Sequence, residues 1–142
     1  MIKLLIIDDS ERQREAIRRA AKRAGFRDAD VTEAATEQEA YDRIAAGSFQ
    51  LAVVDVMLSV PPGLEEGLGV IRALAQAQPL CRIIGLTTKA DTETGVRVLR
   101  AGAHDFISSL WDEINWVELL VQRLNLWRGV IEGHTPRIPG VA

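Results

Sequence analysis

The sequence predicts a three-layer α/β sandwich, in which a parallel sheet is covered by helices on both faces. Short apolar runs such as Leu51–Val54 alternate with segments whose apolar residues recur at helical spacing. Runs of this kind, bounded by polar residues, are typical of strands buried on both faces of a parallel sheet. Glycines follow several of the helical segments, as Gly25, Gly47 and Gly102 do. A fivefold alternation of strand and helix packs most naturally as one parallel sheet between two helical layers.

The expected strands are short and mostly apolar, and the second is the weakest because it carries polar residues. They cover about Lys3–Ile7, Val31–Glu33, Leu51–Val56, Arg82–Leu86 and His104–Ile107. The expected helices follow these strands in turn, and a loop rich in proline and glycine, Ser59–Gly67, precedes the third helix. The helices cover about Ser10–Ala24, Glu37–Ala46, Leu68–Ala77, Asp91–Ala101 and Asp112–Arg128.

Composition limits the class of protein. With 142 residues, 47% of them hydrophobic and 26% charged, the chain has the size and balance of one globular domain. The net charge of −3 argues against a nucleic-acid surface, and the single cysteine, Cys81, excludes an internal disulfide framework. Because no apolar run has the length of a membrane span and no signal-peptide core is present, we expect a cytoplasmic protein. We expect the domain over 1–128 and a flexible tail or linker over 129–142.

Three of the expected strands end in polar residues. Asp8 and Asp9 follow the first strand, Asp55 the third and Thr87 the fourth. In open parallel sheets, ligands bind just outside the carboxyl ends of the strands, so these side chains should meet at one edge. An aspartate after a strand is often only a helix cap, but three clustered carboxylates favour a hard cation such as Mg²⁺.

These residues resemble the receiver domain of bacterial two-component response regulators. Asp8 and Asp9, Asp55, Thr87 and the stretch Ala101–Phe106 come in the order of that family, and the similarity covers about Met1–Arg128. The resemblance implies a flavodoxin-like fold with five helices and a sheet of order 2-1-3-4-5. It also implies a phosphorelay, in which Asp55 accepts a phosphoryl group from a histidine kinase with Mg²⁺.

The resemblance carries roles for individual residues. Asp9 and Asp55 would bind Mg²⁺ directly, Asp8 through water, and Met57 through its backbone carbonyl. Thr87 would form a hydrogen bond with the phosphoryl group and move inward, which leaves space for another side chain to rotate. That side chain is Phe106.

The resemblance also implies how the signal leaves the domain. The face made by the fourth helix, the fifth strand and the fifth helix would change and be read by a downstream protein or an output domain. A sensor histidine kinase or a phosphotransfer protein would donate the phosphoryl group. We further expect that the face supports a homodimer, that neither nucleic acid nor membrane is bound directly, and that the domain is no enzyme beyond its own phosphorylation and dephosphorylation.

The sequence departs from the family after the fifth strand. Ser109 and Leu110 stand at the positions of the family's lysine and proline, so the charge-assisted hydrogen bond of a lysine is lost and coupling to the output face should weaken. Lys89 either reaches back toward the phosphoryl group or, as we favour, is a solvated loop residue. An insertion containing Pro61-Pro62 precedes Gly67; it either narrows the site, selects a partner, or is a neutral surface loop.

Two further interpretations remain open at this point. The domain could be a pseudo-receiver, which binds partners through the same face without phosphorylation, with Ser109 and Leu110 in its favour. An enzyme acting on a small molecule has only the carboxylate cluster to support it.

In the fifth helix, Ile114, Val117, Val121 and Leu124 form the expected buried stripe. Trp116 and Trp127 flank that stripe, and Leu119 and Leu126 lie nearly opposite it, so we expect a second apolar surface that binds a partner. The alternative is that these are scattered surface hydrophobes.

Overall fold

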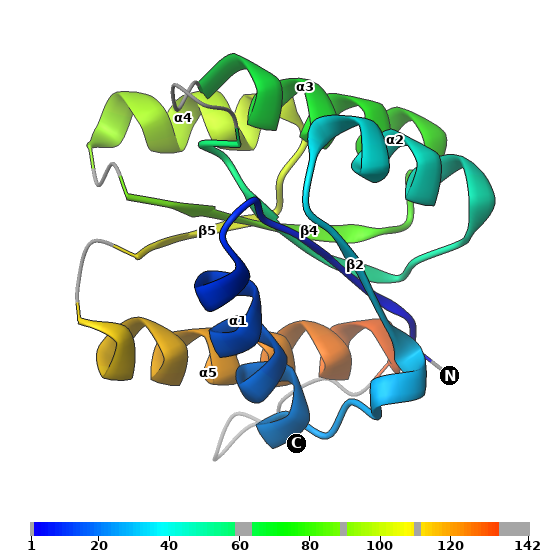
Figure 1. Ribbon diagram of the computed structural model, residues 1–142, viewed down its shortest axis with the longest axis vertical. Helices are drawn as coiled ribbons and strands as arrows, with labels where there is room; N and C mark the ends of the chain where they lie inside the picture. Colours follow the sequence, from blue (N-terminus) through cyan, green and yellow to red (C-terminus); the bar gives the residue numbers. More distant parts are fainter. Residues whose placement is uncertain (1, 59–63, 89–90, 110–111, 134–142) are drawn as a thin grey trace, which may run out of the picture.

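A five-stranded parallel sheet lies between two layers of helices in the computed structural model, which describes residues 2–58, 64–88, 91–109 and 112–133 (Figure 1). The strand order β2-β1-β3-β4-β5 confirms the predicted flavodoxin-like topology. The strands are β1 (Leu4–Ile7), β2 (Val31–Ala34), β3 (Leu51–Asp55), β4 (Arg82–Thr87) and β5 (Asp105–Ser108). The helices are α1 (Glu11–Arg23), α2 (Glu37–Ala46), α3 (Leu64–Ala77), α4 (Thr92–Ala101) and α5 (Glu113–Ile131), with a short 3₁₀ turn at Asp28–Asp30.

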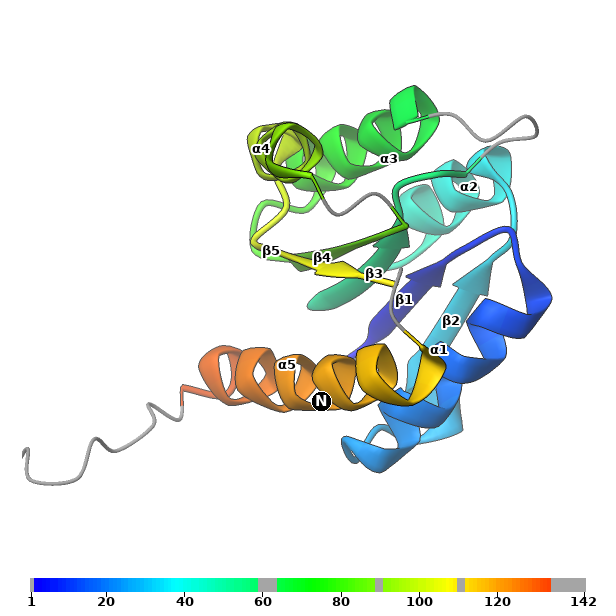
Figure 2. The ribbon, with the colours of Figure 1, turned by 90° about the vertical axis from the view of Figure 1, so that its left-hand side faces the viewer.

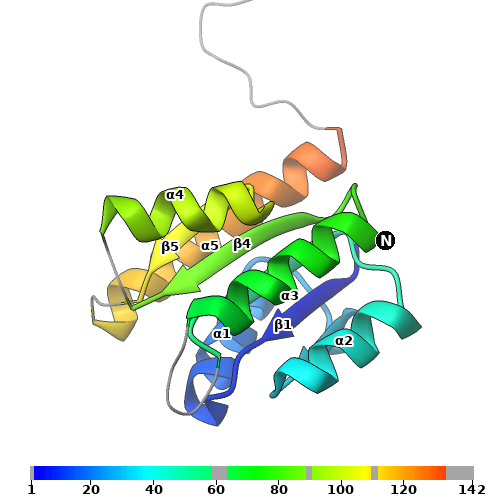
Figure 3. The same ribbon diagram turned by 90° about the horizontal axis from the view of Figure 1, so that it is seen from above.

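Each face of the sheet has its own hydrophobic core. Helices α1 and α5 cover one face, and α2, α3 and α4 cover the other (Figure 2). Seen from above, α3 lies between α2 and α4 over the sheet (Figure 3). Alternate residues of β1 enter the two cores: Leu4 and Ile6 pack toward α1 and α5, whereas Leu5 and Ile7 pack toward α2 and α3. Because both faces are covered, the carboxyl edge of the strands is left for polar groups.

Helix α3 begins at Leu64, earlier than the expected start at Leu68. Gly67 therefore lies inside the helix rather than in the preceding loop. A β-carbon placed on Gly67 would lie 2.0 Å from the carbonyl oxygen of Val56, just after β3. This glycine lets the first turns of α3 approach the end of β3 closely. From the sequence alone, the same glycine indicated a loop before the helix.

Helix α5 differs from the prediction in length and in its buried side. It continues past Arg128 to Ile131, and Ile114 is 77% exposed, so the expected stripe is wrong at that residue. Trp116 is only 4% exposed and belongs to the core, and the Trp127 indole donates a hydrogen bond to Asp105 at 2.9 Å. The two tryptophans are therefore wrong as members of the expected second apolar surface. Leu126 of the same helix is 44% exposed, and a partner surface there stays a prediction. No described helix is both long enough and apolar enough to span a membrane.

Candidate functional site

The three predicted acidic residues lie together at the carboxyl edge of the sheet. β1 and β3 are neighbours with Ile7 opposite Val54, so the residues that follow these strand positions, Asp8 and Asp55, end at the same level. Carboxylate oxygens of Asp8, Asp9 and Asp55 lie within 4.8 Å of one another. Asp8 and Asp55 are buried and Asp9 is exposed, so the cluster is open to solvent on one side.

Asp8 is held by hydrogen bonds at both ends of its carboxylate. The Ser10 amide donates to Oδ1 at 2.8 Å, and the Gln13 side-chain amide donates to Oδ2 at 2.5 Å. The backbone is fixed as well, because the Asp8 N–H donates to the carbonyl of Ala34 and the Arg14 guanidinium donates to the Asp8 carbonyl at 2.7 Å. The first turn of α1 thus positions the carboxylate.

Asp55 is the last residue of β3, and the Met57 N–H donates to its Oδ1 at 3.0 Å. Burial, and then the charges of Asp8 and Asp9, raise the pKa of Asp55 to about 8 against the lowering effect of that N–H. Burial and the charge of Asp9 raise the pKa of Asp8 to about 6, opposed by the bonds from Ser10 and Gln13. The raised pKa values of Asp55 and Asp8 indicate buried carboxylates that have too little positive charge nearby.

The donor set fits a divalent cation. Three carboxylates offer hard oxygen atoms, which are the ligands that Mg²⁺ and Ca²⁺ prefer, and no thiol or imidazole stands among them. A dication there would offset the repulsion that raises the pKa of Asp55 and Asp8. Met57 lies two residues after Asp55, the last residue of β3, at the same edge of the sheet.

Thr87 and Ser109 belong to the next strands along the same edge. Thr87 ends β4 and is fully buried, and the Ser109 N–H donates to the Thr87 carbonyl at 2.7 Å. The Oγ of Ser109 is buried and finds no hydrogen-bond partner within the described part of the chain. Native proteins rarely leave a buried hydroxyl without a hydrogen bond. The Ser109 hydroxyl is therefore available to bind a further polar group at this edge.

Phe106 lies on the face of the sheet that α4 covers. A β-carbon on Gly95 of α4 would come within 2.9 Å of the Phe106 ring, so the ring rests against the helix backbone. Half-buried, the ring also lines a surface cavity of about 320 Å³ formed with Asp91, Thr92, Gly95, Val96 and Leu99. Two of the predicted positions, Lys89 and Leu110, lie outside the described residues, as does the inserted Pro61-Pro62 segment.

The family model for the response regulator receiver domain matches residues 4–120. The chain belongs to this family. The resemblance stated from the strand-end residues is therefore confirmed, and the protein is a receiver domain of a two-component response regulator. Receiver domains of this family interact with histidine kinases and with output domains.

Individual relatives agree with this assignment. Protein PetR of Rhodobacter capsulatus is 35% identical to this receiver domain over 132 residues, which are 93% of this chain and 51% of PetR. A cyclic di-GMP phosphodiesterase of Thermotoga maritima is 34% identical over 104 residues, which are 73% of this chain and 26% of that protein. The chain spans about a quarter to a half of the length of the curated relatives it matches.

Among solved structures, a response regulator from Burkholderia pseudomallei is similar to this receiver domain with a TM-score of 0.68 and 25% identity. The match covers 97% of this chain and 77% of that protein, whose structure contains a phosphorylated aspartic acid, a calcium ion and citrate.

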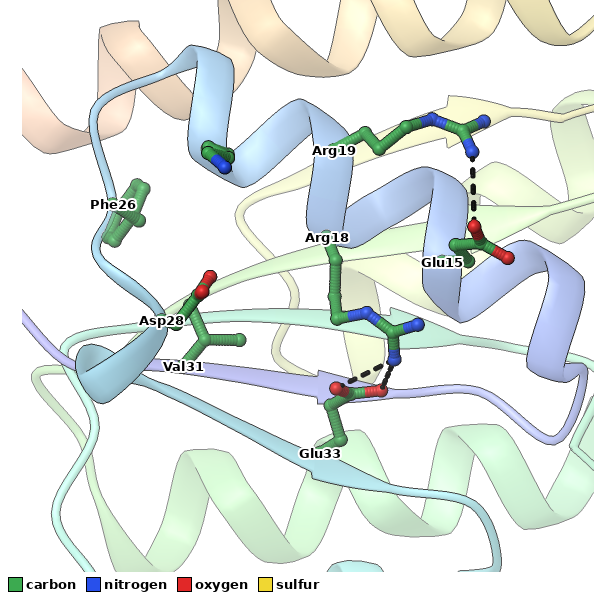
Figure 4. Close-up of a pocket in the computed structure, with 8 residues that line it drawn as sticks. Glu15, Arg18, Arg19, Phe26, Asp28, Val31 and Glu33 are labelled. Atoms are coloured by element: carbon green, nitrogen blue, oxygen red, sulfur yellow. Dashed lines mark hydrogen bonds and ion pairs between the residues drawn. The ribbon is translucent and has the colours of Figure 1, made fainter.

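Two features of the receiver domain were not found by sequence reasoning. The contact of Gln13 with Asp8 depends on the path of the chain between β1 and α1, and no sequence pattern predicts it. The second is a groove of about 350 Å³ between α1 and β2, whose lining does not include Asp8, Asp9 or Asp55 (Figure 4). Its charges largely pair with one another: Arg18 binds both oxygens of Glu33, and Arg19 contacts Glu15.

Proposed function

We propose that this receiver domain accepts a phosphoryl group on Asp55 from a sensor histidine kinase or a phosphotransfer protein, with Mg²⁺ as cofactor. The observation that carries the proposal is the buried Asp55 carboxylate with two further carboxylates within 4.8 Å. Asp9, Asp55 and the Met57 carbonyl would hold the ion directly, and Asp8 would hold it through water. When bound, Mg²⁺ neutralises charge between the anionic carboxylate and the anionic phosphoryl group.

In this proposal one carboxylate oxygen of Asp55 attacks phosphorus. The Met57 N–H donates to Asp55 Oδ1 at 3.0 Å and so orients the carboxylate. The new P–O bond forms as the P–N bond of the donor phosphohistidine breaks, and the electron pair returns to the imidazole nitrogen, which takes up a proton. Pre-orientation of the carboxylate by the Met57 amide supplies the geometry for this displacement.

Thr87 and Phe106 carry the signal away from the site in this proposal. The Thr87 hydroxyl donates to a phosphoryl oxygen, and Phe106 shifts from its place against Gly95 of α4. The surface of α4, β5 and α5 then differs between the two states, and a partner that binds one state better shifts the population toward it. Ser109 offers a neutral hydroxyl where the family has lysine.

The wider setting is also a proposal, because the chain spans only part of its relatives. The domain works in the cytoplasm, has no enzymatic activity beyond its own phosphorylation and dephosphorylation, and signals through protein contacts rather than through nucleic acid or membrane. Its output is a downstream protein or a further domain, and the α4–β5–α5 face is the place for a homodimer.

A pseudo-receiver is the second candidate, and Ser109 favours it. Without a lysine, the phosphoryl group lacks one cation that would bind it. The Ser109 hydroxyl is buried and has no hydrogen-bond partner among the described residues. Such a module would bind partners through the same face in one unmodified state.

Mass spectrometry of the intact protein separates the two candidates. The protein is incubated with acetyl phosphate and Mg²⁺, beside Asp55→Asn as the matched control. The proposal expects one phosphoryl group on the wild type and none on the variant. A wild type that gains none, from acetyl phosphate or from its histidine kinase, would make the domain a pseudo-receiver.

A further inference from the structure

We propose that Gln13 is a positioning residue of the metal site, because its side-chain amide holds the Asp8 carboxylate in the orientation that serves the cation. This inference rests on the proposed Mg²⁺ binding and adds to it a residue outside the acidic cluster. Gln13 itself touches no cation in this account; it acts through Asp8.

The contact is direct and specific. Gln13 Nε2 donates to Asp8 Oδ2 at 2.5 Å, while the backbone N–H of Ser10 donates to Oδ1 at 2.8 Å. Asp8 is 0% exposed, so water cannot easily replace either donor. The Ser10 bond belongs to the backbone and survives most substitutions, whereas the Gln13 bond depends on one side chain.

Electrostatics make a second donor necessary. The carboxylates of Asp9 and Asp55 come within 4.8 Å of that of Asp8, and like charges at this distance push the carboxylate away from its neighbours. A single hydrogen bond at Oδ1 leaves the carboxylate free to rotate about it. The Gln13 amide fixes the second oxygen and removes that freedom before the cation arrives, which lowers the entropy lost on binding.

Neither helix capping nor core packing accounts for the Gln13 side chain. The start of α1 is capped by Ser10, whose hydroxyl accepts the Gln13 backbone N–H at 3.2 Å, and that bond does not need the glutamine side chain. The residue lines a shallow surface groove of about 210 Å³ with Ser10, Arg12, Glu113 and Trp116 and belongs to neither hydrophobic core. Its one side-chain hydrogen bond among the described residues goes to Asp8.

The test is a Mg²⁺ titration by calorimetry of the wild type, Gln13→Leu and Gln13→Met. Gln38→Leu is the matched control, because the Gln38 amide also donates to an aspartate, Asp42, at 3.0 Å on the exposed side of α2. Loss of a residue that orients a metal ligand commonly lowers affinity by about 10–100-fold. We expect Kd for Mg²⁺ to rise about tenfold in both Gln13 variants and to stay unchanged in Gln38→Leu.

Thermal unfolding with and without Mg²⁺ provides an independent readout. The rise in melting temperature caused by a fixed Mg²⁺ concentration should shrink in both Gln13 variants and not in Gln38→Leu, since stabilisation by a ligand follows its affinity. Gln13→Met keeps the length of the side chain, so agreement between the two Gln13 variants assigns the effect to the lost amide.

The outcomes separate this inference from the proposed function. A wild type that binds Mg²⁺ together with Gln13 variants whose Kd stays within twofold would overturn the role of Gln13 alone. A wild type that binds no Mg²⁺ would overturn the metal site, and the role of Gln13 with it.

Discussion

Asp55 is held in a state that a folded protein seldom tolerates: a buried carboxylate beside two others. Its pKa is raised to about 8 and that of Asp8 to about 6, against an ordinary value of 3.8 for both, with burial as the first cause. The folded protein thus binds protons at these sites more tightly than the unfolded chain does. Stability from this source is fully present below pH 3.8 and is lost as the pH rises through 6 and then 8.

The loss of stability with rising pH can be tested on the metal-free protein. In the presence of EDTA, the free energy of unfolding of the wild type relative to Asp55→Asn should fall as the pH rises from about 4 to about 9. Urea unfolding at a series of pH values measures the difference. His104, whose pKa is lowered by burial and by Arg82, works in the opposite sense but is present in both proteins. A flat difference across this range would contradict the raised pKa of Asp55.

Ser109 gives a stability prediction. Its buried hydroxyl has no partner among the described residues, and an unsatisfied buried group costs about 1–3 kcal/mol. Ser109→Ala should therefore raise the free energy of unfolding by about 1 kcal/mol in urea titrations. A decrease in stability would show that the hydroxyl is satisfied.

The strand-end residues and their meeting at one edge of the sheet could be predicted, whereas the hydrogen bond that orients Asp8 could not. Asp8, Asp55 and Thr87 follow apolar runs, so the topology alone brings them to one edge. Gln13 escaped prediction because its bond to Asp8 spans the turn between β1 and α1, whose path depends on tertiary packing.

The helices show where periodicity stops being informative. Helix α5 is apolar on more than one side, so several buried stripes fit the same sequence. Apolar packing against α1 and the sheet selects one of them, and it buries Trp116 in the core and leaves Ile114 exposed. Ion pairs of Glu113 with Arg19 and of Glu118 with Arg23 border this contact between α1 and α5.

Helix α3 carries two glycines whose roles differ, and their substitution separates the roles. Gly67→Ala would put a β-carbon 2.0 Å from the Val56 carbonyl oxygen, and relief of that clash should lower the free energy of unfolding by about 1–3 kcal/mol. At Gly69 the β-carbon would meet only the Tyr41 hydroxyl, at 3.3 Å. Gly69→Ala should be neutral or stabilising through helix propensity. Equal losses in urea unfolding for the two variants would contradict this packing role of Gly67.

The arrangement of the whole sheet was the most predictable feature of the molecule. A fivefold alternation of buried strand and amphipathic helix admits few topologies, because parallel crossovers are right-handed and both faces of the sheet must be covered. β1 and β3 are buried on both faces, and this burial explains their apolar sequences. The ends of the elements were less predictable, because glycines such as Gly67 pack inside a helix, and because α5 continues past Arg128.

The same architecture accounts for how one charge change could reach a distant surface. Asp55 and Thr87 end neighbouring strands in the middle of the sheet, and Phe106 lies on the adjoining strand against α4. A phosphoryl group at Asp55 would therefore act on β4 first and on the α4–β5–α5 face next. Output through that face belongs to the proposed function and depends on phosphorylation at one residue.

Trapping the phosphoryl group with borohydride, which reduces an aspartyl phosphate to homoserine, identifies that residue. The protein is treated with acetyl phosphate and Mg²⁺, reduced and digested with trypsin. Two peptides are then sequenced by mass spectrometry: Ile44–Arg72, which contains Asp55, and Leu4–Arg12, which contains Asp8 and Asp9. We predict homoserine at position 55. Homoserine at Asp8 or Asp9 instead, or at no position even when a histidine kinase is the donor, would contradict the assignment of Asp55 as the phosphoacceptor.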